Sequence, residues 1–130
     1  MKTVTAWKKK LEFESKQDHN TIKLDGKKEK GFGPKALLLS GLAGCSGIDV
    51  VDILEKMRVD FSSFEIDTEA TVTEDHPKVF KEIRMIYKIK TDKDNEEKVR
   101  KAIDLSLDKY CGVSAMLKKN SPITYQLIIE

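Results

Sequence analysis

Apolar and polar positions alternate near both ends of the chain, and one long apolar stretch lies between them. Residues 1–10, 11–15 and 21–24 alternate with the period of half-buried β-strands. Polar turns separate them, which predicts an antiparallel meander of three strands. Residues 61–73 and 79–90 alternate again around a polar turn, which is typical of a β-hairpin.

The apolar stretch predicts one long helix over residues 34–58. Pro34 suits the first helical position, because proline has no N–H to lose there. Residues 36–48 carry no charge, and apolar side chains continue nearly all the way round the helix, which indicates burial on several sides. A membrane span needs about 20 predominantly apolar residues, and Asp49 and Asp52 interrupt this run. We therefore expect a central core helix.

An amphipathic helix follows the hairpin, with Asp92 or Asp94 as its cap. Gly112 is expected to break it, a short helical turn follows at 113–117, and residues 123–129 form a closing strand. The order is βββ-α-ββ-α-α-β. This order predicts an α+β fold, with an antiparallel sheet packed on the long central hydrophobic helix, in one domain over residues 1–130.

Three glycines recur every third residue in the long helix, at Gly41, Gly44 and Gly47. Glycine in a helix interior costs about 1 kcal/mol of helix stability relative to alanine, so three glycines at regular spacing indicate a structural role. They would let another backbone approach the helix closely, either in the core or across a dimer interface. The same approach would frame Cys45.

Composition narrows the function classes. The 130 residues are 39% hydrophobic and 35% charged, which is typical of a folded globular chain. The 24 basic and 22 acidic residues are interspersed and leave a net charge of +2, so we expect no nucleic-acid partner. Met1 leads straight into a strand pattern instead of a secretory signal, which favours the cytoplasm. In a reducing compartment, Cys45 and Cys111 are thiols with a chemical role or inert core residues, not a structural disulfide.

Two segments around the cysteines carry a family resemblance. The first is GPKALLLSGLAGCSGIDVVDIL, with Cys45 in mid-helix, and the second is LSLDKYCGVSAMLKKNSPITYQL, with Cys111 before a short helix. Together with the order of elements and the chain length, they resemble the OsmC/Ohr superfamily of osmotically induced and organic hydroperoxide resistance proteins, in particular its YhfA-like branch. The resemblance covers essentially the whole chain.

The resemblance implies an intertwined homodimer, in which two sheets wrap around paired central helices and two active sites lie at the subunit interface. It also implies a stress-response peroxidase that reduces organic hydroperoxides, with Cys45 as the attacking thiol and Cys111 as the resolving thiol. In such a cycle a thiolate is oxidised to a sulfenic acid, which the second thiol converts to a disulfide. A cellular dithiol would then regenerate the pair. No cofactor or metal is needed.

The chain departs from the Ohr-type enzymes at two charged positions. Those enzymes carry an arginine in the N-terminal part and a glutamate directly after the helix-opening proline. Here Lys35 follows the proline, and the arginines lie only at Arg58, Arg84 and Arg100. Lys35 is a possible supporting cation, although ten residues of helix separate it from Cys45 by about 15 Å. Asp49 lies one turn beyond Cys45 on the same face and is the second possible supporting residue.

Two alternatives complete the predictions from sequence. A zinc site is not expected, because the remaining soft ligands, His19 and His76, lie in turns and no ligand spacing repeats. The alternative function is a non-catalytic dimer of the same fold that binds a small hydrophobic ligand at the subunit interface. No membrane association is expected.

Overall fold

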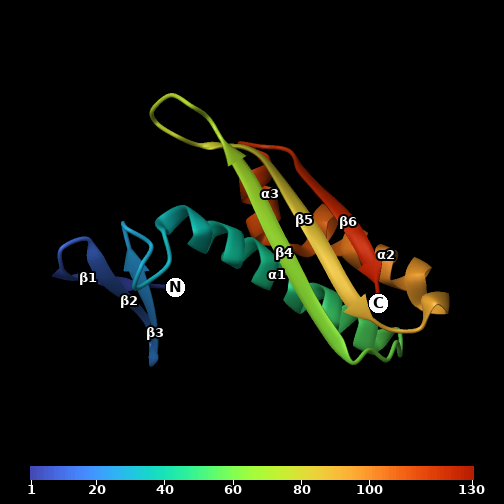
Figure 1. The fold of residues 1–130 in the computed structure, drawn as a ribbon. Helices are drawn as coiled ribbons and strands as arrows, with labels where there is room; N and C mark the ends of the chain where they lie inside the picture. The colour runs from blue at the N-terminus through green and yellow to red at the C-terminus, as the bar shows by residue number, and fades with distance from the viewer. The chain divides into compact units, whose positions relative to one another are not determined.

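Figure 1 shows the computed structural model, which describes residues 1–130. The order of elements confirms the expected βββ-α-ββ-α-α-β arrangement, with a 3-10 turn and a π turn added around the second helix. The chain forms two compact units, residues 1–38 and 39–130, so the single domain over residues 1–130 stays a prediction. The elements are β1 (Val4–Lys9), β2 (Glu12–Gln17), β3 (Asn20–Asp25), α1 (Pro34–Lys56), β4 (Ser63–Val72), β5 (Phe80–Lys90), α2 (Glu96–Leu105), α3 (Gly112–Lys118) and β6 (Ile123–Ile129).

The first unit is the expected antiparallel meander, with strand order β1-β2-β3. None of the buried core side chains comes from this unit, and Trp7 and Ile22 are exposed on its strands. A loop returns after β3 and bonds back to it, because the Phe32 N–H donates to the carbonyl of Lys23. Gly31 is required there, since a Cβ atom would lie 2.7 Å from the Lys23 backbone.

Asp25 organises this loop. Its carboxylate accepts backbone N–H groups from Lys27 at 2.9 Å, Glu29 at 3.3 Å and Lys30 at 3.0 Å. These bonds, led by the one from Lys27, lower the pKa of Asp25 below the usual carboxyl value, and burial opposes them. The ionised side chain therefore stabilises the loop.

We expect an Asp25→Asn change to loosen this loop at neutral pH. A depressed folded pKa contributes stability above the unfolded carboxyl pKa of about 3.9, and the contribution is lost as the pH falls through the folded value. Amide hydrogen exchange of Lys27 and Lys30 should therefore be faster in the variant than in the wild type at neutral pH, and this difference should vanish once the pH falls below the lowered pKa of Asp25. Glu29→Gln, which leaves the Asp25 bonds intact, is the control. Equal protection in Asp25→Asn and wild type would contradict the assignment.

Helix α1 begins at Pro34 as expected and ends at Lys56, in a capping motif that the sequence analysis did not predict. Arg58 adopts a left-handed conformation (φ 58°), its N–H donates to the carbonyl of Glu55, and the Val59 N–H donates to the carbonyl of Leu54. This pair of bonds is a Schellman cap, in which a non-glycine residue takes the position that glycine usually occupies. The side chains of Val59 and Leu54 are both buried beside it.

The expectation that α1 is buried on several sides is wrong for the single chain. Its buried residues form one stripe at four-residue spacing, and Leu38, Ile48 and Val51 are 50%, 72% and 40% exposed. The reason is that the sheet and helices of the second unit contact only one side of α1. The buried stripe consists of Leu42, Ser46, Val50 and Leu54.

Helix α1 is also long and apolar enough to cross a membrane by length and composition. Its buried stripe nevertheless packs into the protein core, where Leu42, Val50 and Leu54 are fully covered. Core helices of soluble proteins pass the same test, and α1 is a core helix along its buried stripe.

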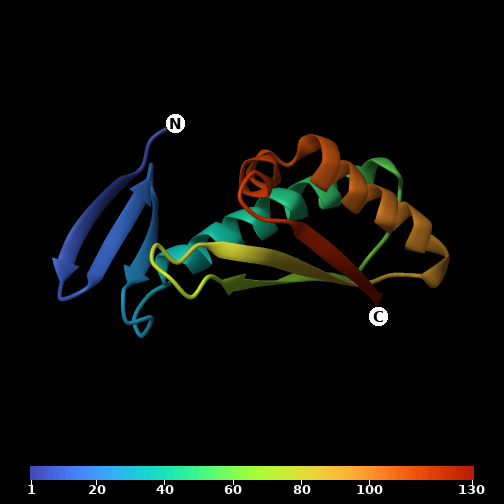
Figure 2. The ribbon, with the colours of Figure 1, turned by 90° about the horizontal axis from the view of Figure 1, so that it is seen from above.

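The second unit contains a three-stranded sheet in the order β4-β5-β6. Strands β4 and β5 form the predicted antiparallel hairpin, whereas β6 runs parallel to β5. The expected antiparallel pairing is thus corrected for β6. The chain crosses over through α2 and α3 before it enters β6, and such a crossover is what parallel pairing requires. Figure 2 shows the helices on one face of this sheet.

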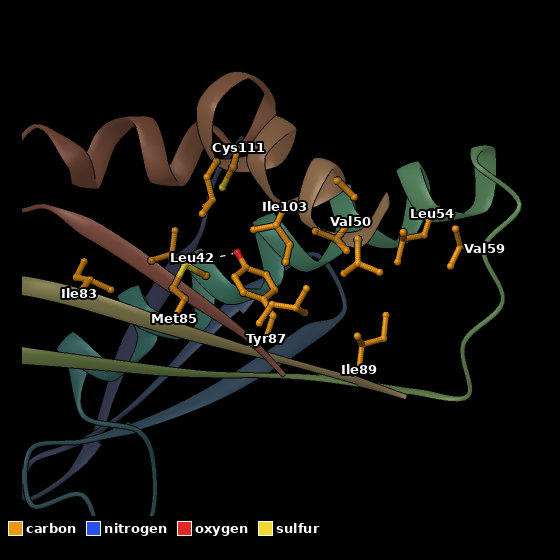
Figure 3. Close-up of a cluster of buried hydrophobic side chains, with 14 of the residues drawn as sticks. Leu42, Val50, Leu54, Val59, Ile83, Met85, Tyr87, Ile89, Ile103 and Cys111 are labelled. Atoms are coloured by element: carbon orange, nitrogen blue, oxygen red, sulfur yellow. Dashed lines mark hydrogen bonds between the residues drawn. The ribbon is translucent and has the colours of Figure 1, made fainter. Parts of the chain in front are cut away.

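The core lies between that face and the helices. Strand β5 supplies Ile83, Met85, Tyr87 and Ile89, all almost fully buried, as the alternation predicted. Figure 3 shows these side chains converging on Leu42, Val50 and Ile103 from the helices. A register shift lies between Thr71 and Val72, opposite Phe80, and Phe80 is buried whereas Val79 is exposed.

The break after α2 differs from the expected one. The expected caps of the helix are wrong, because the N-cap of α2 is Asn95, and Asp92 instead caps the 3-10 turn (Lys93–Asn95) that precedes it. Helix α2 continues into a π turn (Ser106–Tyr110), and the chain leaves the helix at Cys111. Gly112 does not break the helix and is instead the first residue of α3. The wider π turn ends the helix, because the Cys111 N–H bonds to the carbonyl of Ser106.

Candidate active site

The two cysteines come from different helical segments of the second unit and belong to the same core cluster. Cys45 is half-buried on α1 and packs against the core, and Cys111 is 3% exposed at the N-terminal cap of α3. Both are free thiols. Cys45 is near enough to Cys111 to raise the pKa of the Cys111 thiol. Figure 3 shows Cys111 entering the core cluster from its helical segment.

The environment of Cys111 favours its protonated form. Burial is the main cause that raises the pKa of the Cys111 thiol, and the neighbouring Cys45 side chain adds to it. The Ser114 N–H donates to the sulfur at 3.3 Å and opposes the shift. Cys111 is therefore a buried neutral thiol at pH 7, and Cys45 is the thiol that a small molecule reaches more easily.

A chain of hydroxyl groups runs beside the thiols. The hydroxyl oxygens of Ser46 and Tyr87 are 2.6 Å apart, and those of Ser46 and Ser106 are 2.9 Å apart. The Ser106 hydroxyl also lies 2.9 Å from a carboxylate oxygen of Asp49. Ser46, Ser106 and Tyr87 are fully buried, so all three hydroxyls depend on one another for hydrogen bonds.

The Ser106 hydroxyl is the donor toward both the Ser46 hydroxyl and the carboxylate of Asp49, which can only accept when ionised. Between Ser46 and Tyr87 either hydroxyl can be the donor. Burial raises the pKa of Tyr87, so its hydroxyl remains a donor. The sulfur of Met85 lies 3.6 Å from the same hydroxyl.

Of the two predicted supporting residues, the structure brings Asp49 close to the thiol pair through Ser106. Lys35 is exposed in the first turn of α1 and takes part in no ion pair or side-chain hydrogen bond. Two other basic residues of the second unit also have other surroundings: Arg84 donates to Gln126 on the sheet, and His76 is exposed in the β4–β5 loop.

The sequence reasoning missed the hydroxyl chain. Ser46 directly follows Cys45, and Ser106 interrupts an apolar helical face between Ile103 and Leu107. A small polar residue inside an otherwise apolar stripe could have indicated a buried hydrogen bond. The sequence does not identify the partner, because Ser46 and Ser106 lie 60 positions apart in the chain.

A groove of about 630 Å³ lies between α1 and β4. Its wall is largely apolar, with Gly44, Ile48 and Phe64 among its residues and carboxylates of Asp52 and Glu55 at its edge, and Cys45 does not line it. No group of three or more His, Cys, Asp or Glu side chains is arranged to hold a metal ion.

The sequence of this chain matches a known protein family and a known relative over most of its length. The model of the OsmC-like protein family matches residues 26–126. The protein YhfA of Escherichia coli K12 is 34% identical over 128 residues, which span 96% of this chain and 95% of that protein.

Solved structures share the fold. A hypothetical protein from Aquifex aeolicus is 30% identical with a TM-score of 0.85, over 99% of this chain and 96% of that one. An OsmC-like protein from Mycoplasma pneumoniae is 19% identical with a TM-score of 0.86, over 98% and 95%. The organic hydroperoxide resistance protein OhrB of Bacillus subtilis is 16% identical with a TM-score of 0.67, over 98% and 96%.

Proposed function

Because this chain belongs to the OsmC-like protein family, we propose that it is a thiol-dependent peroxidase that reduces organic hydroperoxides through Cys45 and Cys111. The observation that carries the proposal is that the two cysteines, which come from segments far apart in the sequence, pack in one core cluster. One structural neighbour, OhrB of Bacillus subtilis, is named an organic hydroperoxide resistance protein, and this name supports the choice of substrate.

The reaction has two balanced steps. The Cys45 thiolate attacks one peroxide oxygen and the O–O bond breaks, which gives a Cys45 sulfenic acid and an alkoxide that takes up a proton to become the alcohol. The Cys111 thiol then attacks the sulfenic sulfur, a disulfide forms, and water leaves. A cellular dithiol of the cytoplasm returns two electrons and two protons and restores both thiols.

The assignment of roles follows from accessibility. Cys45 is half-buried, whereas Cys111 is 3% exposed and is held protonated by burial. The more accessible thiol meets the peroxide, and the buried thiol is protected from direct oxidation until a sulfenic acid forms beside it.

We also propose that the functional form is a homodimer. In the single chain α1 leaves Ile48 and Val51 exposed, and a Cβ atom at Gly41 or Gly44 would meet nothing within 4 Å. An apolar helix face with open glycines suits close approach of a second helix, here that of an identical chain. Such pairing would cover Gly41, Gly44 and Ile48, which lie within four positions of Cys45 in the sequence.

The groove between α1 and β4 favours a second candidate function. Its apolar wall could hold a small hydrophobic ligand, and Ile48 and Val51 would place that ligand at the proposed subunit interface. In this alternative the fold serves binding, and the thiols are inert core residues.

Intact-mass spectrometry of the reduced protein distinguishes the two functions. After one equivalent of cumene hydroperoxide, the peroxidase should lose about 2 Da, the mass of the two hydrogens released on disulfide formation. The loss should be faster than with hydrogen peroxide. An unchanged mass after minutes would refute the peroxidase and leave the binding function.

A further inference from the structure

A side-chain hydrogen bond between Ser46 and Ser106 joins the two cysteine segments. Ser46 is the residue after Cys45 on α1. The carbonyl of Ser106 accepts the Cys111 N–H at 2.7 Å across the π turn. A bond of 2.9 Å between the two serine hydroxyls therefore connects the immediate backbone surroundings of both thiols.

We propose that Ser46 and Ser106 are positioning residues that hold Cys45 and Cys111 at the separation needed for disulfide formation, and that Asp49 orients the Ser106 hydroxyl for this purpose. The proposal deepens the proposed function, on which it rests, because it concerns the step in which the sulfenic acid is resolved.

Burial gives this contact its strength. Both serines are fully buried, so water cannot replace a lost partner without opening the core. Asp49 is only half-buried, but its carboxylate accepts from Ser106 at 2.9 Å, and a charged acceptor makes a stronger bond than a neutral one. The Ser106 hydroxyl is thereby held between its two acceptors, Ser46 and Asp49.

The π turn makes this arrangement possible. In a regular helix the Cys111 N–H would bond to the carbonyl of Leu107, four residues earlier. The five-residue spacing of the π turn instead connects Cys111 to Ser106, the residue that contacts α1. Such π turns occur frequently at functional sites.

The inference can be tested without peroxide. In exchange with oxidised dithiothreitol, Cys45 and Cys111 each lose a proton and together two electrons, and the reagent takes these up to become its dithiol. The equilibrium constant of this exchange reports how well the protein holds its thiols together. We expect Ser106→Ala and Ser46→Ala each to lower it about tenfold, which corresponds to about 30 mV in the reduction potential of the disulfide.

The control is Ser121→Ala, which removes another buried serine hydroxyl and should leave the constant unchanged. The double variant Ser46→Ala/Ser106→Ala should lose no more than the larger single variant, because both changes remove the same bond. An additive loss, or equal constants in Ser106→Ala and Ser121→Ala, would overturn the proposal. If Ser106→Ala does not fold, Ser46→Ala tests the same contact.

The outcome is separable from that of the proposed function. A wild-type protein that equilibrates with dithiothreitol but ignores cumene hydroperoxide would refute the peroxidase and leave the positioning role intact. A wild-type protein that consumes the peroxide, with variants whose constants do not change, would refute the positioning role alone. A wild-type protein that forms no disulfide with oxidised dithiothreitol would overturn it as well.

Discussion

Cys45→Ser is expected to abolish the consumption of organic hydroperoxide, with a loss of roughly three orders of magnitude or more, as for removal of any nucleophile. Serine keeps the shape of the side chain, but its hydroxyl does not become a sulfenic acid. Since Cys45 is the more accessible thiol and Cys111 is buried and protonated, Cys111 should not take over. Peroxide loss in a coupled or colorimetric assay is the measurement.

Cys111→Ser is the matched variant and should behave differently. The first step remains, so one equivalent of cumene hydroperoxide should add the mass of one oxygen atom, and the sulfenic acid should persist until a reagent traps it. Turnover should stop after this equivalent. If Cys45→Ser gained oxygen and Cys111→Ser did not, the two roles would have to be exchanged.

Ile48→Glu should convert the proposed dimer into a monomer. Ile48 is 72% exposed in the single chain, on the face of α1 where Gly44 is open. In a dimer that buries this face, the new carboxylate would lose its water without gaining a partner, which costs several kcal/mol. Each 1.4 kcal/mol changes an equilibrium constant tenfold, so we expect the dissociation constant of the dimer to rise by about 100-fold or more. Sedimentation or light scattering with size exclusion measures it.

Ile128→Glu provides the control for this experiment. Ile128 is also an exposed isoleucine, but it lies on β6 and not on α1. The control should keep the mass of the wild-type assembly. A wild-type protein that is already monomeric, or an Ile48→Glu protein that stays dimeric, would contradict the assignment of this face.

Local pattern alone determined most of the fold. The alternation in β5 predicted which side of the strand is buried, because successive side chains of a strand point to opposite faces. The long helix could be predicted from its proline start and its uncharged run. The two cysteine segments identified the family, since they combine residue type, spacing and predicted structure over most of the chain.

Other features depended on contacts between distant residues. The direction of β6 follows from the path of α2 and α3, and Phe80 is buried opposite a register shift in β4. The Schellman cap at Arg58 places a non-glycine residue in a left-handed conformation, which helix propensity disfavours and local packing of Val59 on Leu54 compensates.

The candidate site divides in the same way. The sequence by itself determined that Cys45 and Cys111 are its candidate thiols, because their residue type and context carry the chemistry. Only the tertiary structure decided that Ser46, Ser106 and Tyr87 form a hydrogen-bonded chain beside them, and that Lys35 does not take part in it. A hydrogen bond requires two groups within about 3 Å, and for residues 60 positions apart the fold alone sets that distance.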